Sequence, residues 1–260
     1  MTKKALQEQI RSPEKNRLNI IAHRGASYRA PENTLAAVNL AWKLGADVVE
    51  VDVHLTRDRK IMVMHDDSTG RTAGFHLIIR EAVSSNLRKL DVGAWKSSAY
   101  TGEKIPFLEE VLAVIPEGKC LLVEIKSDRE IIPVLEKIIE ASGKKSRIAV
   151  ISFSYKVVAR MKEVMPNIPV HWLCTYTEHK TLTSFDHEDT VEALLTSGFD
   201  GLDIRYRGLT GDVVTTVKSA GLKLYTWTIN DLHEALRARE LGVDGITTDH
   251  PSLLRELLND

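Results

Sequence analysis

The stretch ADVVEVDVHLTRDRKIMVMH, residues 46–65, decides the fold expected for this chain of 260 residues. It holds two apolar runs, 46–53 and 61–65, separated by a link of only about seven residues. A crossover between parallel strands needs about a dozen residues or more. The second run is therefore predicted to fold back on the first as the other arm of a β-hairpin.

Short apolar runs alternate with helical periodicity along the rest of the chain. Apart from the hairpin arm, eight strands are predicted, at 19–22, 46–53, 120–125, 148–152, 170–174, 199–204, 222–227 and 245–248. Helices are predicted at 33–44, 108–115, 128–141, 155–165, 188–196, 210–220, 231–241 and 251–258. Eight successive βα units predict an α/β fold, a (β/α)8 TIM barrel with a β-hairpin after its second strand.

The segment between the hairpin and the next helix, about 66–105, is much longer than an ordinary barrel loop. We expect it to form a small insertion over the mouth at the carboxyl ends of the strands. Residues 19–260 are then expected to form a single barrel domain, and residues 1–18 an N-terminal extension.

Composition argues against several classes of partner. Lysine and arginine (35) nearly balance aspartate and glutamate (36), so no broad basic field would hold nucleic acid or an anionic membrane. No apolar run reaches the roughly 18 residues of a transmembrane helix, and the start lacks the apolar centre of a signal peptide. Two cysteines, Cys120 and Cys174, do not suggest a disulfide framework. We expect a cytoplasmic protein, or a periplasmic or secreted one if a signal peptide has been removed.

Among the acidic residues in predicted barrel strands, three are candidates for a site. Glu50 and Asp52 point to the same face of their strand because successive side chains alternate, and Glu124 lies in a second strand. Both faces of a parallel barrel strand are covered, so unpaired carboxylates there are costly. A divalent cation, Mg²⁺ or Ca²⁺ rather than zinc, would resolve the cost. The alternative is that these acids merely pair with bases such as Arg24 or Lys126.

Two histidines are expected beside these acids. The first strand ends in AHRGASYRAPENT (22–34), which supplies His23 and Arg24, and the hairpin returns His65 to the same end of the barrel. Trp227 is interpreted either as barrel packing or as an apolar wall for a substrate. The remaining singled-out histidines are expected to be structural: His54, His76, His171 and His250.

Together these motifs resemble the signature of the glycerophosphodiester phosphodiesterases. The matching segments are HRG (23–25), PENT (31–34), EVDVHLTRD (50–58), HDD (65–67), VEIK (123–126), GLDIR (201–205), WTIN (227–230) and DGITTDHP (244–251). They run in order from about residue 20 to residue 251. The resemblance implies a barrel enzyme that hydrolyses glycerophosphodiesters to sn-glycerol 3-phosphate and an alcohol.

The resemblance also implies roles for individual residues. One divalent cation would be held by Glu50, Asp52 and Glu124; His23 and His65 would be the acid–base pair; Arg24, Glu32 and Lys126 would border the phosphate or glycerol; and Trp227 would line the substrate pocket. The chain departs from the family pattern after Asp58, where Arg59 replaces the usual glycine of the hairpin turn.

Several alternatives stay open at this point. Either histidine could be the acid, and the attacking oxygen could come from water or from the glycerol 2-hydroxyl, which would form a cyclic phosphate. A lysophospholipase D would use the same centre with an apolar rim, for which Phe75 and residues 77–79 are candidates. A noncatalytic glycerophosphodiester-binding protein and, more weakly, a sugar-phosphate isomerase are further alternatives. The alcohol released and the oligomeric state are left undetermined.

Overall fold

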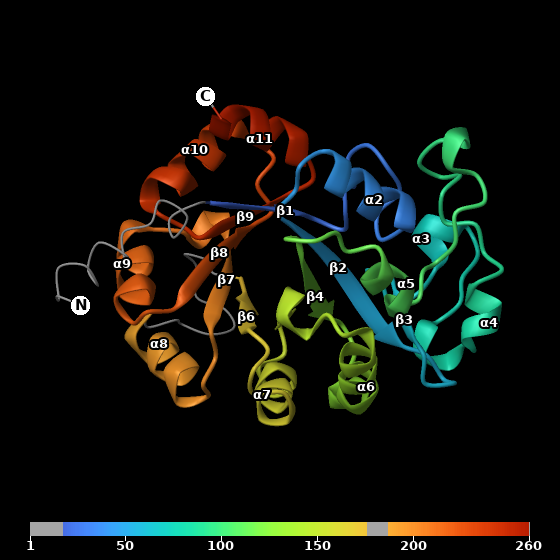
Figure 1. Ribbon diagram of the computed structural model, residues 1–260, viewed down its shortest axis with the longest axis horizontal. Coiled ribbons are helices and arrows are strands. Elements are labelled where there is room, and N and C mark those ends of the chain that lie inside the picture. The colour runs from blue at the N-terminus through green and yellow to red at the C-terminus, as the bar shows by residue number, and fades with distance from the viewer. Residues whose placement is uncertain (1–17, 176–186, 260) are drawn as a thin grey trace.

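Eight parallel strands close into a barrel in the computed structural model, which describes residues 18–175 and 187–259 (Figure 1). The barrel closes because β1 pairs in parallel with both β2 and β9. The expected N-terminal extension lies outside the described residues apart from Leu18. The strands are β1 (Asn19–Ala22), β2 (Val48–Leu55), β4 (Cys120–Ile125), β5 (Ile148–Ser152), β6 (Val170–Cys174), β7 (Gly201–Arg205), β8 (Lys223–Trp227) and β9 (Gly245–Thr248).

A ring of helices surrounds the strands, which confirms the predicted (β/α)8 TIM barrel (Figure 1). None of the helices in the described part of the chain is long and apolar enough to cross a membrane. The ring helices are α2 (Leu35–Lys43), α5 (Leu108–Ala113), α6 (Ile132–Ser142), α7 (Tyr155–Val164), α8 (His187–Thr196), α9 (Gly211–Ser219), α10 (Leu232–Leu241) and α11 (Pro251–Asn259).

Two helices begin two or more residues later than predicted, each for a local reason. Helix α2 begins at Leu35 rather than 33, because the Thr34 hydroxyl accepts the Ala37 N–H as an N-cap and Asn33 has a left-handed backbone with φ 57°. Helix α6 begins at Ile132 rather than 128, after a 3₁₀ turn at Arg129–Ile131.

The short strand β3 (Ile61–Val63) folds back and pairs antiparallel with β2, with Val53 opposite Val63. The strand ends two residues earlier than predicted, although the Met64 N–H still donates to the Asp52 carbonyl of β2 at 3.0 Å. His65 therefore lies beyond the strand, on the segment that leads away from it.

The segment that follows β3 forms the predicted small insertion, which lies outside the ring of helices (Figure 1). It contains the short helices α3 (Gly70–Ala73) and α4 (Ser84–Leu87). It is anchored to the loop after β1, where the Lys96 ammonium donates to the Ser27 carbonyl at 2.8 Å. Its apolar cluster is separate from the main core and contains Met62, Met64, Ile79, Leu87, Val92 and Ile105.

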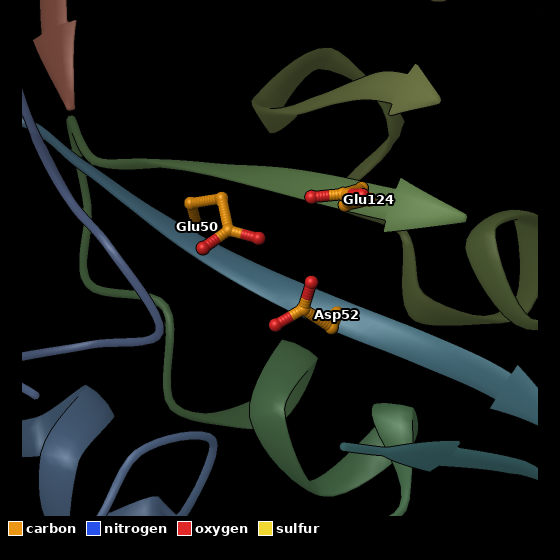
Figure 2. A group of neighbouring side chains, drawn as sticks. All are labelled: Glu50, Asp52 and Glu124. Carbon is orange, nitrogen blue, oxygen red and sulfur yellow. The ribbon is translucent and has the colours of Figure 1, made fainter. Parts of the chain in front are cut away.

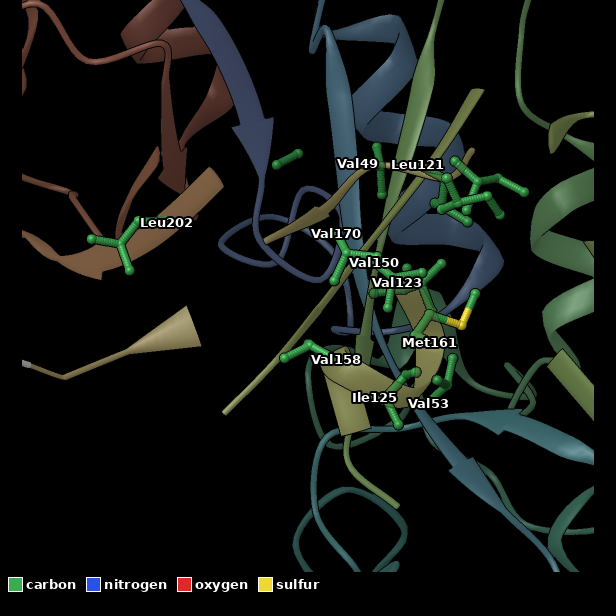
Figure 3. Packing of buried hydrophobic residues seen from close by; sticks show 14 of the residues in the cluster. Val49, Val53, Leu121, Val123, Ile125, Val150, Val158, Met161, Val170 and Leu202 are labelled. Atoms are coloured by element: carbon green, nitrogen blue, oxygen red, sulfur yellow. The ribbon is translucent and has the colours of Figure 1, made fainter. Parts of the chain in front are cut away.

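Strand alternation divides the side chains between two layers. The inward faces of β2 and β4 carry the acids Glu50, Asp52 and Glu124 (Figure 2). Outward-facing residues of the same strands, such as Val53 and Val123, pack in the main apolar core with residues of helix α7 (Figure 3). The apolar layer outside the barrel thus fixes which side chains face the interior.

Candidate active site

Three carboxylates form a compact cluster inside the barrel. One oxygen from each of Glu50, Asp52 and Glu124 lies within 4.8 Å of the others. Asp52 and Glu124 are direct neighbours across the β2–β4 pairing. Figure 2 shows the three carboxyl groups turned toward one another, as predicted from the alternation of the strand.

The cluster has more negative charge than its protein surroundings neutralise. Burial and the two neighbouring acids raise the pKa of Glu50 well above its usual range, and burial with Asp52 raises that of Glu124 to about 7. Burial also opposes ionisation of Asp52, but Lys126 and Arg24 outweigh it and hold that pKa below normal. Glu50 Oε1 is buried and has neither a hydrogen bond nor an ion pair with any described residue, whereas Asp52 Oδ1 and Glu124 Oε1 both lie against Lys126 Nζ.

These acids could hold a cation. The donor set is all oxygen, and carboxylate oxygens are the ligands that hard divalent ions take. The bases considered as alternative partners are also present: Lys126 Nζ lies 3.1 Å from Asp52 Oδ1 and pairs with Glu124. Lys126 therefore offsets part of the negative charge of Asp52 and Glu124 but forms no ion pair with Glu50.

Arg24 joins the loop after β1 to the acid cluster. Its backbone has φ 55°, and its N–H donates to Glu50 Oε2 at 2.8 Å. The guanidinium donates to Glu32 Oε1 at 2.9 Å and lies 3.3 Å from Asp52 Oδ2. Asn33 donates to the same Asp52 oxygen at 2.7 Å. The left-handed conformations at Arg24 and Asn33 thus hold polar groups against the acids.

His23 is oriented by a carboxylate from the far end of the sequence. Its Nδ1 lies 2.7 Å from Asp249 Oδ1, and Asp249 also accepts from Ser27 Oγ at 2.8 Å and Asn230 Nδ2 at 2.6 Å. Burial opposes the charge of Asp249, but the donors His23, Asn230 and Ser27 lower its pKa. Because a carboxylate can only accept, the proton of neutral His23 lies on Nδ1 and leaves Nε2 as the other, unprotonated nitrogen.

His65 has a similar partner with different surroundings. Its Nδ1 lies 2.6 Å from Asp66 Oδ1, and Arg71 Nε donates to the other Asp66 oxygen at 2.7 Å. Arg71, together with His65, lowers the pKa of Asp66 to about 2. Burial lowers the pKa of His65, against the attraction of Asp52. Arg71 also binds both oxygens of Glu32, so Glu32 joins Arg24 to the insertion.

A cavity of about 210 Å³ at the barrel mouth brings most of the predicted site together. Glu32 and Asp52 are not among its lining residues, and no lining residue comes from 66–105. The insertion thus borders the mouth through Arg71 but does not line this cavity. The lining residues are His23, Arg24, Glu50, His65, Glu124, Lys126, Ile151, Phe153, Leu173, Asp203, Trp227, Thr228 and Thr247.

The histidines expected to be structural lie outside the cavity lining. His54 Nε2 lies 3.1 Å from the His65 carbonyl, and His171 is buried against Tyr225, with 4.7 Å between the ring centroids. His250 stacks on Tyr28 with its centroid 3.8 Å away, and His76 is exposed in the insertion.

Sequence reasoning gave no role to several polar residues that the structure brings to the site, and four of them lie in recognisable sequence contexts. Asn33, Asn230 and Asp249 belong to the matching segments PENT (31–34), WTIN (227–230) and DGITTDHP (244–251). The fourth, Asp203, lies on β7, and its inward position follows from strand alternation. The available signal was a charged residue in the middle of a buried strand, the same signal that identified Glu124.

An acid cluster suited to a divalent ion, two imidazoles oriented by carboxylates and two cationic side chains meet at the carboxyl end of a TIM barrel. Such a site belongs to a hydrolase class that acts on anionic esters. Comparison with known proteins specifies the family.

The glycerophosphoryl diester phosphodiesterase family model matches residues 23–253. A glycerophosphodiester phosphodiesterase of Caldanaerobacter subterraneus is 33% identical, with 92% of this chain and 97% of that protein covered. Bacillus subtilis YhdW is 34% identical, with 90% and 96% covered. An Oleispira antarctica phosphodiesterase solved with the product sn-glycerol-3-phosphate aligns with a TM-score of 0.85 and 30% identity, covering 93% and 97%. The chain therefore belongs to this family of phosphodiesterases.

Proposed function

We propose that the protein hydrolyses glycerophosphodiesters to sn-glycerol 3-phosphate and an alcohol in a metal-dependent reaction, with His23 and His65 as the acid–base pair. The observation that carries the proposal is the cavity in which both imidazoles, each paired through Nδ1 with an aspartate, meet the acid cluster. The similar Oleispira enzyme, solved with sn-glycerol-3-phosphate as its product, supports the choice of substrate.

Glu50, Asp52 and Glu124 would hold one divalent cation, Mg²⁺ or Ca²⁺. When bound there, the cation would supply Lewis-acid chemistry by offsetting the negative charge of the phosphodiester. It would also offset the three buried negative charges, which Arg24 and Lys126 neutralise only in part.

The residues of the chain perform the remaining steps. Arg24 and Lys126 bind the anionic phosphate and stabilise the charge that develops as the ester bond breaks. One imidazole removes a proton from the attacking oxygen, and the other protonates the leaving alkoxide. Glu32 holds Arg24 in place, and Trp227 forms an apolar wall of the cavity. The attacking oxygen belongs either to water or to the glycerol 2-hydroxyl.

The apolar rim considered for a lysophospholipase D does not border the cavity. The apolar insertion residues considered as a rim do not line the cavity: Ile79 is fully buried in the insertion core, and Phe75 is exposed outside the lining. A lysophospholipase D would need an apolar surface that continues from the cavity along the acyl chain.

The first test is the release of glycerol 3-phosphate from a panel of glycerophosphodiesters, after EDTA treatment and after adding back Mg²⁺ or Ca²⁺. We expect release only with added metal, and ³¹P NMR of the same reactions would detect a cyclic phosphate intermediate. Lysophosphatidylcholine in parallel tests the longer substrate. If folded protein releases no glycerol 3-phosphate with either metal, the proposal is wrong.

The two histidines are tested separately. His23→Ala and His65→Ala should each lower kcat by about 10²-fold or more, since general acid–base groups contribute about that much. His76→Ala is the matched control, because His76 is an exposed histidine outside the cavity. Wild-type turnover in His65→Ala would exclude its role.

A further inference from the structure

Two buried polar residues that line the cavity have no role in the mechanism above. Asp203 of β7 is 1% exposed and Thr247 of β9 is 3% exposed, and both line the cavity. Asp203 Oδ1 and Thr247 Oγ1 are buried and form no hydrogen bond with any described residue. A ligand in the cavity could provide the missing partners.

Their surroundings make these unpaired groups costly. Asp203 lies beside Leu173 of β6 and Tyr225 of β8 in the sheet, and no ion pair to it is present among the described residues. A buried polar group without a hydrogen bond destabilises the folded protein. Burial, reinforced by Glu124, raises the pKa of Asp203 well above its usual range.

The two groups lie away from the acid cluster, on another part of the barrel wall. The cluster is on the adjacent strands β2 and β4, whereas β5 and β6 separate β4 from β7, and β1 separates β2 from β9. Strand β8 lies between β7 and β9 and supplies Trp227, whose indole N–H donates to the Asp203 carbonyl at 3.4 Å. An aromatic face is thus flanked by an unpaired carboxyl and an unpaired hydroxyl.

This arrangement suits a short polyol. The carbon-bound hydrogens of a polyol can pack on an indole ring while its hydroxyls bond to flanking polar groups. The phosphate-binding groups Arg24 and Lys126 line the same cavity of about 210 Å³, so a ligand that carries both a phosphate and hydroxyls could reach both sets.

We propose that Asp203 and Thr247 form the glycerol subsite, in which their side chains bind the hydroxyl groups of the substrate's glycerol moiety against Trp227. The proposal rests on the hydrolysis proposed above and specifies which half of the diester this side of the barrel recognises. A substrate without these hydroxyls leaves both groups unpaired, and that loss is the basis of selectivity.

The test compares glycerol 3-phosphate with propyl phosphate, which has the same phosphate and carbon chain but no hydroxyls. Binding of each to the Mg²⁺-loaded protein is measured by calorimetry. Wild type should bind glycerol 3-phosphate at least about tenfold more tightly, because a hydrogen bond to an otherwise unpaired buried group contributes on the order of 1.4 kcal/mol.

Asp203→Leu and Thr247→Val remove the polar atoms with little change in volume. Each should weaken glycerol 3-phosphate binding about tenfold and leave propyl phosphate binding within about twofold. Thr226→Val is the matched control: Thr226 also has a buried, unpaired hydroxyl but does not line the cavity. It should leave both affinities unchanged.

Asp203→Leu should also unfold at the same temperature as wild type or higher, because it removes an unpaired buried polar group. A large fall in thermal stability would indicate a structural role. Equal wild-type affinity for the two ligands, binding of neither, or a preference that survives both substitutions would overturn the subsite. Hydrolysis is measured on the same preparations: continued glycerol 3-phosphate release would then show that only the subsite is wrong, whereas its absence would refute the proposed reaction.

Discussion

At the scale of single residues, the two imidazoles of the site differ in the partners of their aspartates. Asp249, which pairs with His23, takes its other hydrogen bonds from the neutral groups of Ser27 and Asn230. Asp66, which pairs with His65, is also bound by the Arg71 guanidinium. More of the negative charge of Asp249 is therefore available to its imidazole. We expect this pairing to contribute to catalysis by fixing the ring orientation and the tautomer.

Asp249→Asn should lower kcat about tenfold or more and leave KM within about twofold, because the residue acts through His23 rather than on substrate. Steady-state kinetics with the best substrate of the panel would measure this split. Ser27→Ala is the control, because it removes one donor to Asp249 and keeps the carboxylate. A rise in KM with unchanged kcat would contradict the positioning role.

At the scale of elements, the β2–β3 hairpin brings His65 back to the mouth through a strained turn. Arg59 has φ 57°, a left-handed conformation that favours glycine. The departure from the family pattern at this position therefore has a structural cost in the turn. The hairpin forms because the pairing of β3 with β2 and its packing in the insertion core offset that cost.

Arg59→Gly should raise the free energy of unfolding by about 1 kcal/mol, because it relieves the left-handed strain and loses only an exposed hydrogen bond to the Glu130 carbonyl. Denaturant unfolding would measure the change. Gly74→Ala is the opposite control: Gly74 has φ 65° with no atom within 4 Å of an added Cβ, so only strain is introduced. The Gly74→Ala variant should have a free energy of unfolding about 1 kcal/mol lower than that of the wild type. A less stable Arg59→Gly would show that the arginine side chain supports the hairpin.

At the scale of the whole molecule, the barrel interior carries titratable groups whose charge is linked to folding. His171 of β6 is fully buried, and burial lowers its pKa to about 4. The cation would likewise couple to folding, because only the folded chain brings Glu50, Asp52 and Glu124 together.

The pKa of His171 makes stability depend on pH with a definite sign. The unfolded histidine, with a pKa of about 6.5, binds a proton more readily than the folded one. This contribution to stability is complete above pH 6.5 and is lost as pH falls toward 4. At pH 5 the loss is on the order of 2 kcal/mol.

His171→Leu should therefore lose less stability than wild type between pH 7.5 and pH 5, as measured by denaturant unfolding at both values. The exposed His233 provides the control, since His233→Gln should leave the pH dependence unchanged. An identical pH dependence in wild type and His171→Leu would contradict the linkage.

Metal binding should also stabilise the folded protein against unfolding. Mg²⁺ or Ca²⁺ at about 100 times its Kd should stabilise the wild type by about 2.7 kcal/mol, because the ion binds only the folded state. Thermal unfolding with EDTA and with each ion would measure the shift, and Glu50→Gln should reduce it. Asp212→Asn, at an exposed acid on α9, should retain the full shift. No shift for either ion would argue against a cation site.

The sequence by itself determined the order of the βα units, the fold-back of β3 and the shared face of Glu50 and Asp52. These features depend on local quantities: the period of apolar residues, the length of a link and the alternation along a strand. The same information predicted that His23 and His65 meet at the mouth. It missed the start of α2, because the backbone conformation of Asn33 depends on its contacts with Asp52.

Only the tertiary structure decided which polar residues are partners and which are left unpaired. His23 and Asp249 are 226 residues apart in the chain, and barrel closure between β1 and β9 brings them together. Alternation places Asp203 inside the barrel, but its lack of a partner depends on the neighbouring strands. Pairing and burial result from contacts between distant segments, whereas sequence periodicity reports only the face on which a side chain lies.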